Sequence, residues 1–190
     1  SGVSAGRETA ALGSAMRGAD VTLIHGPTAL PPVKFTEDVP ITTAQDMYEA
    51  VTSRFADMDI LVMAAAVADY RPATVTVASD KIKKKDGDLS IPVERTADIL
   101  GTIGPRKTKQ FLCGFSMETR DMVENSAAKL KKKNLDMVVA NNLKVSGAGF
   151  GVDTNVVTFI TPDGTRELPL MSKADVADAI LDEILKRRGH

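Results

Sequence analysis

The stretch "DILVMAAAVAD", residues 59–69, decides the fold, because it is apolar without a break. A strand that is covered on both faces has such a continuous apolar run, whereas a half-exposed strand alternates apolar and polar residues. Two further stretches are of the same kind, "QFLCGFSME" at residues 110–118 and "LDMVVANN" at residues 135–142. We therefore expect parallel strands in a sheet with both faces covered.

Helices are predicted between these strands. "TTAQDMYEAVTSRFADM", residues 42–58, has apolar residues at helical spacing and Thr43 as a candidate N-cap. "TRDMVENSAAKLKKKN", residues 119–134, is also amphipathic. Further helices are predicted at residues 7–20, ending at Gly18, at residues 96–104, and at residues 172–188, capped by Ser172.

Shorter strands complete the pattern. Residues 20–26 read as a strand, residues 89–95 as a weak edge strand, and residues 155–170 as a hairpin around Asp163-Gly164. Alternating strands and helices give a parallel sheet with crossover helices. The fold class is therefore α/β: a Rossmann-like, doubly wound, mostly parallel sheet with helices on both faces plus a C-terminal β-hairpin. Residues 1–190 form one domain.

The composition narrows the classes of function. Acidic and basic residues nearly balance, 25 against 24, with a net charge of −1, which argues against a general nucleic-acid binder. We expect no membrane association, because no apolar stretch approaches the roughly 20 residues that span a bilayer and the start has no signal-peptide pattern. The single cysteine, Cys113, lies in an apolar run and reads as a buried structural thiol, which fits a reducing cytoplasm.

Ligands in such sheets bind beyond the carboxyl ends of the strands. The small residues 64–66 leave the backbone uncovered there, so that a flat base or a ribose fits against it; the same residues also allow tight packing of helices on the sheet. Asp69 follows as a partner for a ribose or a Mg²⁺-bound water, or as a helix cap. Both interpretations of each feature stay open at this point.

Two lysine clusters lie near this edge. Lys81 begins the first, which continues with residues 83–85 in a connection between strands, where a lysine can neutralise phosphate oxygens on a segment that closes over a ligand. The second cluster lies at the C-terminal end of the predicted helix 119–134. Its members Lys129 and Lys133 are four residues apart and therefore lie on one face of that helix. Solvated surface and compensation of the helix dipole are the alternatives. The C-terminal end of that helix is expected to point away from the carboxyl edge, so that only a tilted helix or a long reach of the lysine side chains would bring them to a ligand.

Other motifs exclude some functions. "SGAGFG", residues 146–151, lies between strands and not before a helix, so it does not fit a dinucleotide fingerprint. A nicotinamide-dependent oxidoreductase predicts a GxGxxG between the first strand and helix, which the chain does not have. His25 and His190 are the only histidines, which argues against a histidine-rich metal site or a conventional serine–histidine triad.

Several segments together resemble a known family. They are "AAAVADYRP" (64–72), "KIKK" (81–84), "TADIL" (96–100), "GFSMET" (114–119), "AAKLKKKNLDMVVANN" (127–142) and "GAGFGVDTNVVTFI" (147–160). In this order, from about residue 10 to the end, they resemble the phosphopantothenoylcysteine synthetase (phosphopantothenate–cysteine ligase) family, the bacterial CTP-using type.

The resemblance implies a reaction in two steps. The carboxylate of 4′-phosphopantothenate attacks the α-phosphate of CTP, pyrophosphate leaves, and the amine of cysteine then displaces CMP from the acyl-cytidylate. Charge neutralisation by lysines and Mg²⁺ meets the physical demand of this chemistry. The resemblance also implies a homodimer, and relatives are often fused to a flavin-dependent decarboxylase.

The family's site residues carry over by position. Lys81 is the expected catalytic residue. The expected nucleotide-binding residues are Met63, Ala64, Ala65, Asp69, Lys81, Ala97, Asp98, Ile99, Leu100, Phe115, Lys129 and Lys133. Residues 97–100 match a "PDIV"-like segment, with alanine in place of proline.

The front of the chain departs from the family pattern. Family members begin with a strand, a "TAGPTRE"-like turn and an asparagine-bearing "SSGKMG"-like loop, where this sequence has only "VSAGRETAALG", residues 3–13. We expect the N-terminal strand and loop to be missing or altered. Two hypotheses follow: a CTP-dependent ligase of coenzyme A biosynthesis, or a nucleotide-binding homologue that lacks ligase activity.

Overall fold

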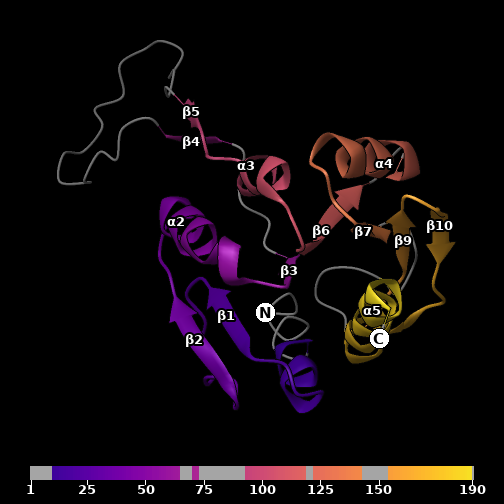
Figure 1. The fold of residues 1–190 in the computed structure, drawn as a ribbon, viewed down its shortest axis with the longest axis horizontal. Coiled ribbons are helices and arrows are strands. Elements are labelled where there is room, and N and C mark those ends of the chain that lie inside the picture. Colours follow the sequence, from indigo (N-terminus) through magenta and orange to yellow (C-terminus); the bar gives the residue numbers. More distant parts are fainter. Residues whose placement is uncertain (1–9, 65–69, 73–92, 119–121, 143–153, 190) are drawn as a thin grey trace, which may run out of the picture.

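A five-stranded sheet forms the centre of the molecule (Figure 1). The computed structural model describes residues 10–64, 70–72, 93–118, 122–142 and 154–189. The strand order is β10-β9-β7-β6-β3. The strands are β3 (Ile60–Met63), β6 (Phe111–Glu118), β7 (Met137–Asn142), β9 (Val157–Thr161) and β10 (Gly164–Glu167).

The register brings the apolar strands of the sequence side by side. β3 pairs with β6 and β6 with β7 in parallel, with Met63 opposite Gly114 and Phe115 opposite Val139. β9 runs antiparallel to β7 and forms a hairpin with β10. The predicted α/β class, with a mostly parallel sheet and a C-terminal hairpin, is confirmed.

Helices cover both faces of this sheet (Figure 1). One face packs against α2 (Ala44–Arg54), α3 (Ile99–Ile103) and α4 (Met122–Lys132). Each helix contributes to the apolar cluster there, α2 through Met47, α3 through Ile103 and α4 through Leu130. The other face packs against α5 (Lys173–Arg188), through residues such as Ile180. Side chains of β6 alternate between the two layers, because successive strand residues point to opposite faces.

Local chemistry explains where two of these helices begin. Thr43 caps α2: its hydroxyl accepts a hydrogen bond from Asp46 N, and the Asp46 carboxylate accepts one from Thr43 N. Ser172 caps α5 through Asp175 N. Both caps were predicted. Gly189 ends α5 with φ of 80°, a conformation that favours glycine.

Three shorter strand pairs lie outside the central sheet. They are β1 (Val21–His25) parallel to β2 (Thr36–Pro40), β4 (Tyr70–Pro72) antiparallel to β5 (Val93–Arg95), and β8 (Thr154–Asn155) antiparallel to β11 (Met171–Ser172). Short 3₁₀ turns follow α2 and α3, namely η1 (Phe55–Asp57) and η2 (Gly104–Arg106). Residues 10–16 are helical, and Gly18 follows with φ of 86°. The predicted altered N-terminal strand falls on residues 1–9, outside the described residues.

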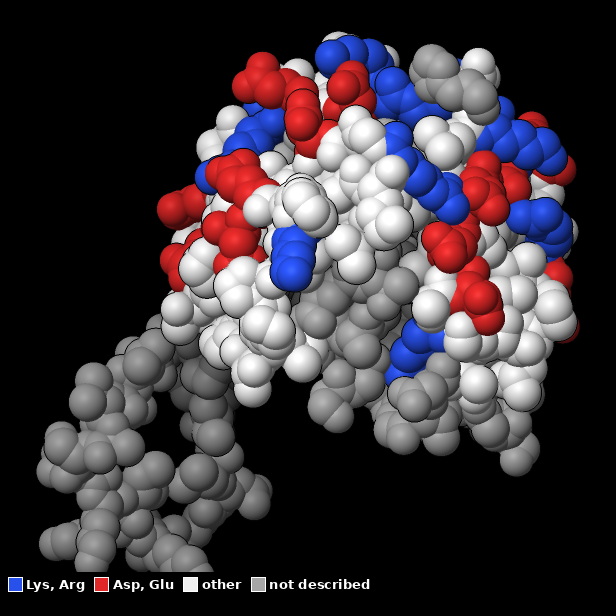
Figure 2. Space-filling view, turned by 90° about the horizontal axis from the view of Figure 1, so that it is seen from below, with Lys and Arg blue, Asp and Glu red and all other residues white. Residues whose placement is uncertain are grey.

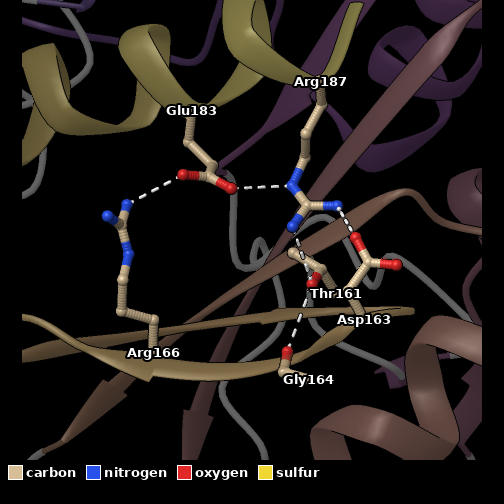
Figure 3. A network of polar contacts seen from close by, with 6 residues as sticks. All are labelled: Thr161, Asp163, Gly164, Arg166, Glu183 and Arg187. Atoms are coloured by element: carbon tan, nitrogen blue, oxygen red, sulfur yellow. Dashed lines mark hydrogen bonds and ion pairs between the residues drawn. The ribbon is translucent and has the colours of Figure 1, made fainter.

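A buried carboxylate ties α5 to the hairpin (Figure 3). Glu183, only 8% exposed, accepts hydrogen bonds from Arg187 Nε and from an Arg166 guanidinium nitrogen, each at 2.8 Å. Arg187 also bonds Asp163 and Thr161 in the hairpin. Partial burial opposes the charge of Arg187, but these carboxylate contacts outweigh it and raise its pKa.

The face seen in Figure 2 carries both signs of charge, with acidic side chains gathered on its left side and basic side chains more frequent along the top and right. Among the residues that the structure describes, we find no helix of sufficient length and apolar character to cross a bilayer.

Candidate nucleotide-binding site

The carboxyl end of β3 and the neighbouring part of β6 form the floor of the candidate site. Met63 ends β3, is 9% exposed and lies opposite Gly114; Ala64 follows and is partly buried. Ile99 and Leu100 of α3 belong to the same apolar cluster as Met63. This cluster fixes the start of α3 against the strand end.

Asp98 stands at the N-cap of α3. Its Oδ1 accepts a hydrogen bond from Gly101 N at 3.0 Å. A Cβ at residue 101 would lie 2.6 Å from Asp98 Oδ2, so glycine at this position leaves room for the cap. The carboxylate keeps about half of its surface exposed and is accessible from solvent.

Lys129 of α4 and Lys133, which directly follows this helix, both reach this region. Lys133 Nζ lies 2.9 Å from Asp98 Oδ2 and 3.0 Å from Oδ1. Lys129 Nζ donates to the carbonyl oxygen of Phe115 at 2.7 Å. The expectation concerned the C-terminal end of the helix and left open a long reach of its lysines; the ammonium groups of Lys129 and Lys133 do reach β6 and the N-cap of α3.

The electrostatics at Asp98 favour its charged form. Partial burial opposes ionisation, but the hydrogen bond from Gly101 N and the ammonium groups of Lys133 and Lys129 outweigh it and hold the pKa of Asp98 below its ordinary value. Among the residues that the structure describes here, the ammonium groups of Lys129 and Lys133 outnumber the single carboxylate of Asp98, as suits a polyphosphate ligand.

Other predicted residues lie near the site but do not all face it. Ile99 and Leu100 are buried in the core, so only their backbone is available to a ligand. Phe115 offers its carbonyl oxygen to Lys129, whereas its ring packs with the cluster on the α5 face. Ala97 is exposed.

Several predicted residues fall outside the described part of the chain. These are Ala65, Asp69, Lys81 with the lysines at 83–85, and the "SGAGFG" loop at 146–151. The proposed roles of the first lysine cluster and of the end of the apolar run in nucleotide binding therefore remain predictions.

The described residues offer no ready-made metal centre. Within them, no group of three or more histidine, cysteine or acidic side chains is placed to hold a metal ion. Asp98 has its two oxygens engaged by Gly101 N and Lys133. His25 is likewise occupied, with Nδ1 2.7 Å from Gly26 O and Nε2 3.0 Å from Asp38 Oδ1.

Asn134 is a residue near the site that sequence reasoning missed. Asn134 Nδ2 donates to Gly104 O at 2.9 Å and so joins the end of α4 to the end of α3. The "KNLD" motif at residues 133–136 was the available signal, but a polar residue after a lysine run reads as solvated surface.

Comparison with known proteins adds a family to this geometry. A family model described as "DNA/pantothenate metabolism flavoprotein C-terminal domain" matches residues 1–187. A Coenzyme A biosynthesis bifunctional protein CoaBC of Bacillus subtilis (strain 168) is 48% identical over 169 residues, which cover 88% of this chain and 41% of that protein. The chain thus spans about two fifths of that relative's length.

Two further proteins are similar over most of the chain. A Cysteine/Cysteine sulfinic acid decarboxylase of an unknown prokaryotic organism is 42% identical over 190 residues, covering 97% of this chain and 52% of that protein. The crystal structure of the C-terminal domain of a CoaBC protein is 41% identical, with a TM-score of 0.78, and covers 95% of this chain and 82% of that one. The fold is therefore shared with a solved domain.

Proposed function

The chain belongs to the DNA/pantothenate metabolism flavoprotein C-terminal domain family, and from this premise we propose that it carries phosphopantothenate–cysteine ligase activity in coenzyme A biosynthesis. One observation carries the proposal. Lys133, which directly follows α4, pairs with Asp98 at the N-cap of α3. Lys129 donates to the carbonyl oxygen of Phe115, the residue after the Gly114 that lies opposite Met63. These contacts support an anion-binding site near the carboxyl ends of β3 and β6, the edge at which parallel sheets bind their ligands.

The reaction follows from what these groups can do. A carboxylate acylates an amine poorly, so attack of 4′-phosphopantothenate on the α-phosphate of CTP first creates an acyl-cytidylate, with loss of pyrophosphate. Cysteine then attacks the acyl carbon through its amine, and CMP leaves. The protein supplies positioning and positive charge for these steps.

The described lysines have a defined role in this proposal. Lys133 is paired with Asp98 and Lys129 with the Phe115 carbonyl oxygen. A phosphate oxygen of CTP competes for the same ammonium groups. The internal acceptors hold both ammonium groups in place, which lowers the conformational entropy lost when the nucleotide binds.

We propose that Mg²⁺ arrives with the triphosphate of CTP. Mg²⁺ usually keeps several waters and binds through substrate phosphates with one or two carboxylates. The oxygens of Asp98 are engaged, so a direct bond from this side chain would require Lys133 to leave. Asp69 is the other carboxylate that the resemblance assigns to the nucleotide.

Further parts of the proposal come from the family alone. We propose a homodimer in the cytoplasm, with CTP, 4′-phosphopantothenate and cysteine as substrates. The word "bifunctional" in the name of the Bacillus relative supports fusion to a second activity, for which a flavin-dependent decarboxylase is our candidate.

A pyrophosphate-release assay with 4′-phosphopantothenate, CTP and cysteine tests the ligase. Calorimetry with CTP·Mg²⁺ and ATP·Mg²⁺ tests the nucleotide, and we expect tighter binding of CTP. Binding of CTP without pyrophosphate release would identify a nucleotide-binding homologue that lacks ligase activity. Failure of both assays would refute the proposal.

A further inference from the structure

After α4 the chain makes a left-handed turn at Asn134, and the proposed reaction gives no reason for this turn. Asn134 adopts a left-handed conformation, with φ of 52°. Leu135 N bonds Leu130 O at 2.9 Å and Asn134 N bonds Lys131 O at 3.3 Å, which together form a Schellman cap. Leu130 and Leu135 both pack in the apolar cluster under the helix, as this cap requires.

This cap is joined to α3 at a point of close backbone approach. Asn134 Nδ2 donates to Gly104 O at 2.9 Å. A Cβ at residue 104 would overlap the carbonyl oxygen of Lys133, so only glycine lets the two helix ends meet in this way. Asp136, two residues further on, accepts from Lys107 Nζ at 2.9 Å and from Leu112 N at 2.7 Å.

The joint lies next to a residue of the candidate site. Lys133 directly precedes Asn134, and its ammonium group meets Asp98 at the other end of α3. α3 has five residues, so its two ends are held by the same short, buried segment. Fixing Gly104 to Asn134 therefore also fixes the distance between Asp98 and the backbone of Lys133.

We propose that Asn134 is a positioning residue for the nucleotide site. By ending α4 in a left-handed turn and donating to Gly104 O, it holds Lys133 against Asp98 and in place for a phosphate oxygen of a nucleoside triphosphate. The inference rests on the proposed function for its ligand, but the positioning of Lys133 is measurable without any ligand.

The test uses Asn134→Gly, which allows the left-handed turn but removes the donor to Gly104 O. Calorimetry with CTP·Mg²⁺ on the full chain should show a Kd raised on the order of fivefold, the equivalent of one hydrogen bond. In a Lys133→Met background the same change should alter Kd less than about twofold, because coupled residues are not additive. An equal effect in both backgrounds overturns the proposal.

A second measurement needs no nucleotide. Gly101 N donates to Asp98 Oδ1, so the pH titration of the Gly101 amide resonance reports the ionisation of Asp98. Asn134→Gly should move this midpoint upward, toward the ordinary aspartate value, as Lys133 moves away. An unchanged midpoint overturns the proposal. If the wild-type chain binds no CTP, the proposed function fails, and this titration alone decides the positioning role.

The control is Ser172→Ala, which removes the cap of α5 on the opposite face of the sheet. Its loss of stability should leave the Kd for CTP and the Gly101 midpoint unchanged; a shift like that of Asn134→Gly would mean that general destabilisation explains both. If Asn134→Gly fails to fold, Asn134→Asp replaces it. That variant keeps the turn but places a carboxylate oxygen against Gly104 O. It should likewise raise the Kd for CTP·Mg²⁺ and move the Gly101 midpoint upward.

Discussion

Lys133 Nζ lies 2.9 Å from Asp98 Oδ2, although 35 residues separate the two in the chain. The pair links the last turn of α4 to the first turn of α3. In the proposed reaction it has a second consequence, because a lysine held by a carboxylate is released only for a stronger anion. A polyphosphate with several negative oxygens is such an anion.

Replacing Lys133 by methionine should weaken nucleotide binding. The change removes one ammonium group from the site while retaining most of the apolar side chain, and a hydrogen bond to a charged group contributes about 1.5–3 kcal/mol. We expect the Kd for CTP·Mg²⁺ to rise on the order of tenfold or more, measured by calorimetry. Lys132→Met, on the exposed side of the same helix, is the control and should have less than about a twofold effect.

Asp98→Asn should change the pH dependence of stability. The folded pKa of Asp98 is lowered, so its charged form stabilises the fold fully above the ordinary aspartate pKa of about 3.9, and this contribution disappears as the pH falls through the folded value. In urea unfolding, the difference in the free energy of unfolding between wild type and Asp98→Asn should therefore become smaller from pH 6 to pH 3. A difference that stays constant over this range would contradict the lowered pKa of Asp98 in the folded protein.

The sequence was sufficient for the elements and insufficient for their contacts. Continuous apolar runs predicted β3, β6 and β7, and a threonine and a serine in the right places predicted two caps. The contact between Lys133 and Asp98 was not predicted from the pattern, because helix direction points the end of α4 away from the site and only a long reach of the lysine side chain joins the two. Asn134 was missed because its role depends on a left-handed φ and on the nearby Gly104, neither of which a charge pattern encodes.

Arg187→Met should lower stability without affecting nucleotide binding. The change leaves the buried Glu183 with Arg166 as its guanidinium partner and removes the bonds from Arg187 to Asp163 and Thr161 (Figure 3). Loss of a partner from a partly buried ion pair should cost about 2–4 kcal/mol of unfolding free energy, measured in urea. Lys186→Met, one residue earlier and exposed, should cost under about 0.5 kcal/mol. Similar losses in both variants would show that the network contributes little.

Cys113 should be inert in the folded protein. Its side chain is fully buried in the layer under α5, and burial raises the pKa of the thiol, so the reactive thiolate is scarce and shielded. Iodoacetamide labelling, followed by intact mass, should be slow in buffer and fast in urea above the unfolding midpoint. Labelling in buffer at the rate of a free peptide thiol would exclude the buried structural role.

Lys81→Gln should slow the activation step more than it weakens CTP binding. The resemblance assigns Lys81 to charge that develops as pyrophosphate leaves, and contacts made mainly in the transition state lower turnover while leaving ground-state affinity nearly unchanged. We expect pyrophosphate release to fall on the order of 10²-fold, the scale for one lost electrostatic stabiliser, while the calorimetric Kd changes less than about threefold. Lys84→Gln, from the same cluster, is the matched control, and its release rate should stay near wild type. If Lys84→Gln abolishes release and Lys81→Gln does not, the assignment within the cluster is wrong. A proportional loss of binding and release in Lys81→Gln would instead show that the lysine stabilises bound CTP and the transition state equally.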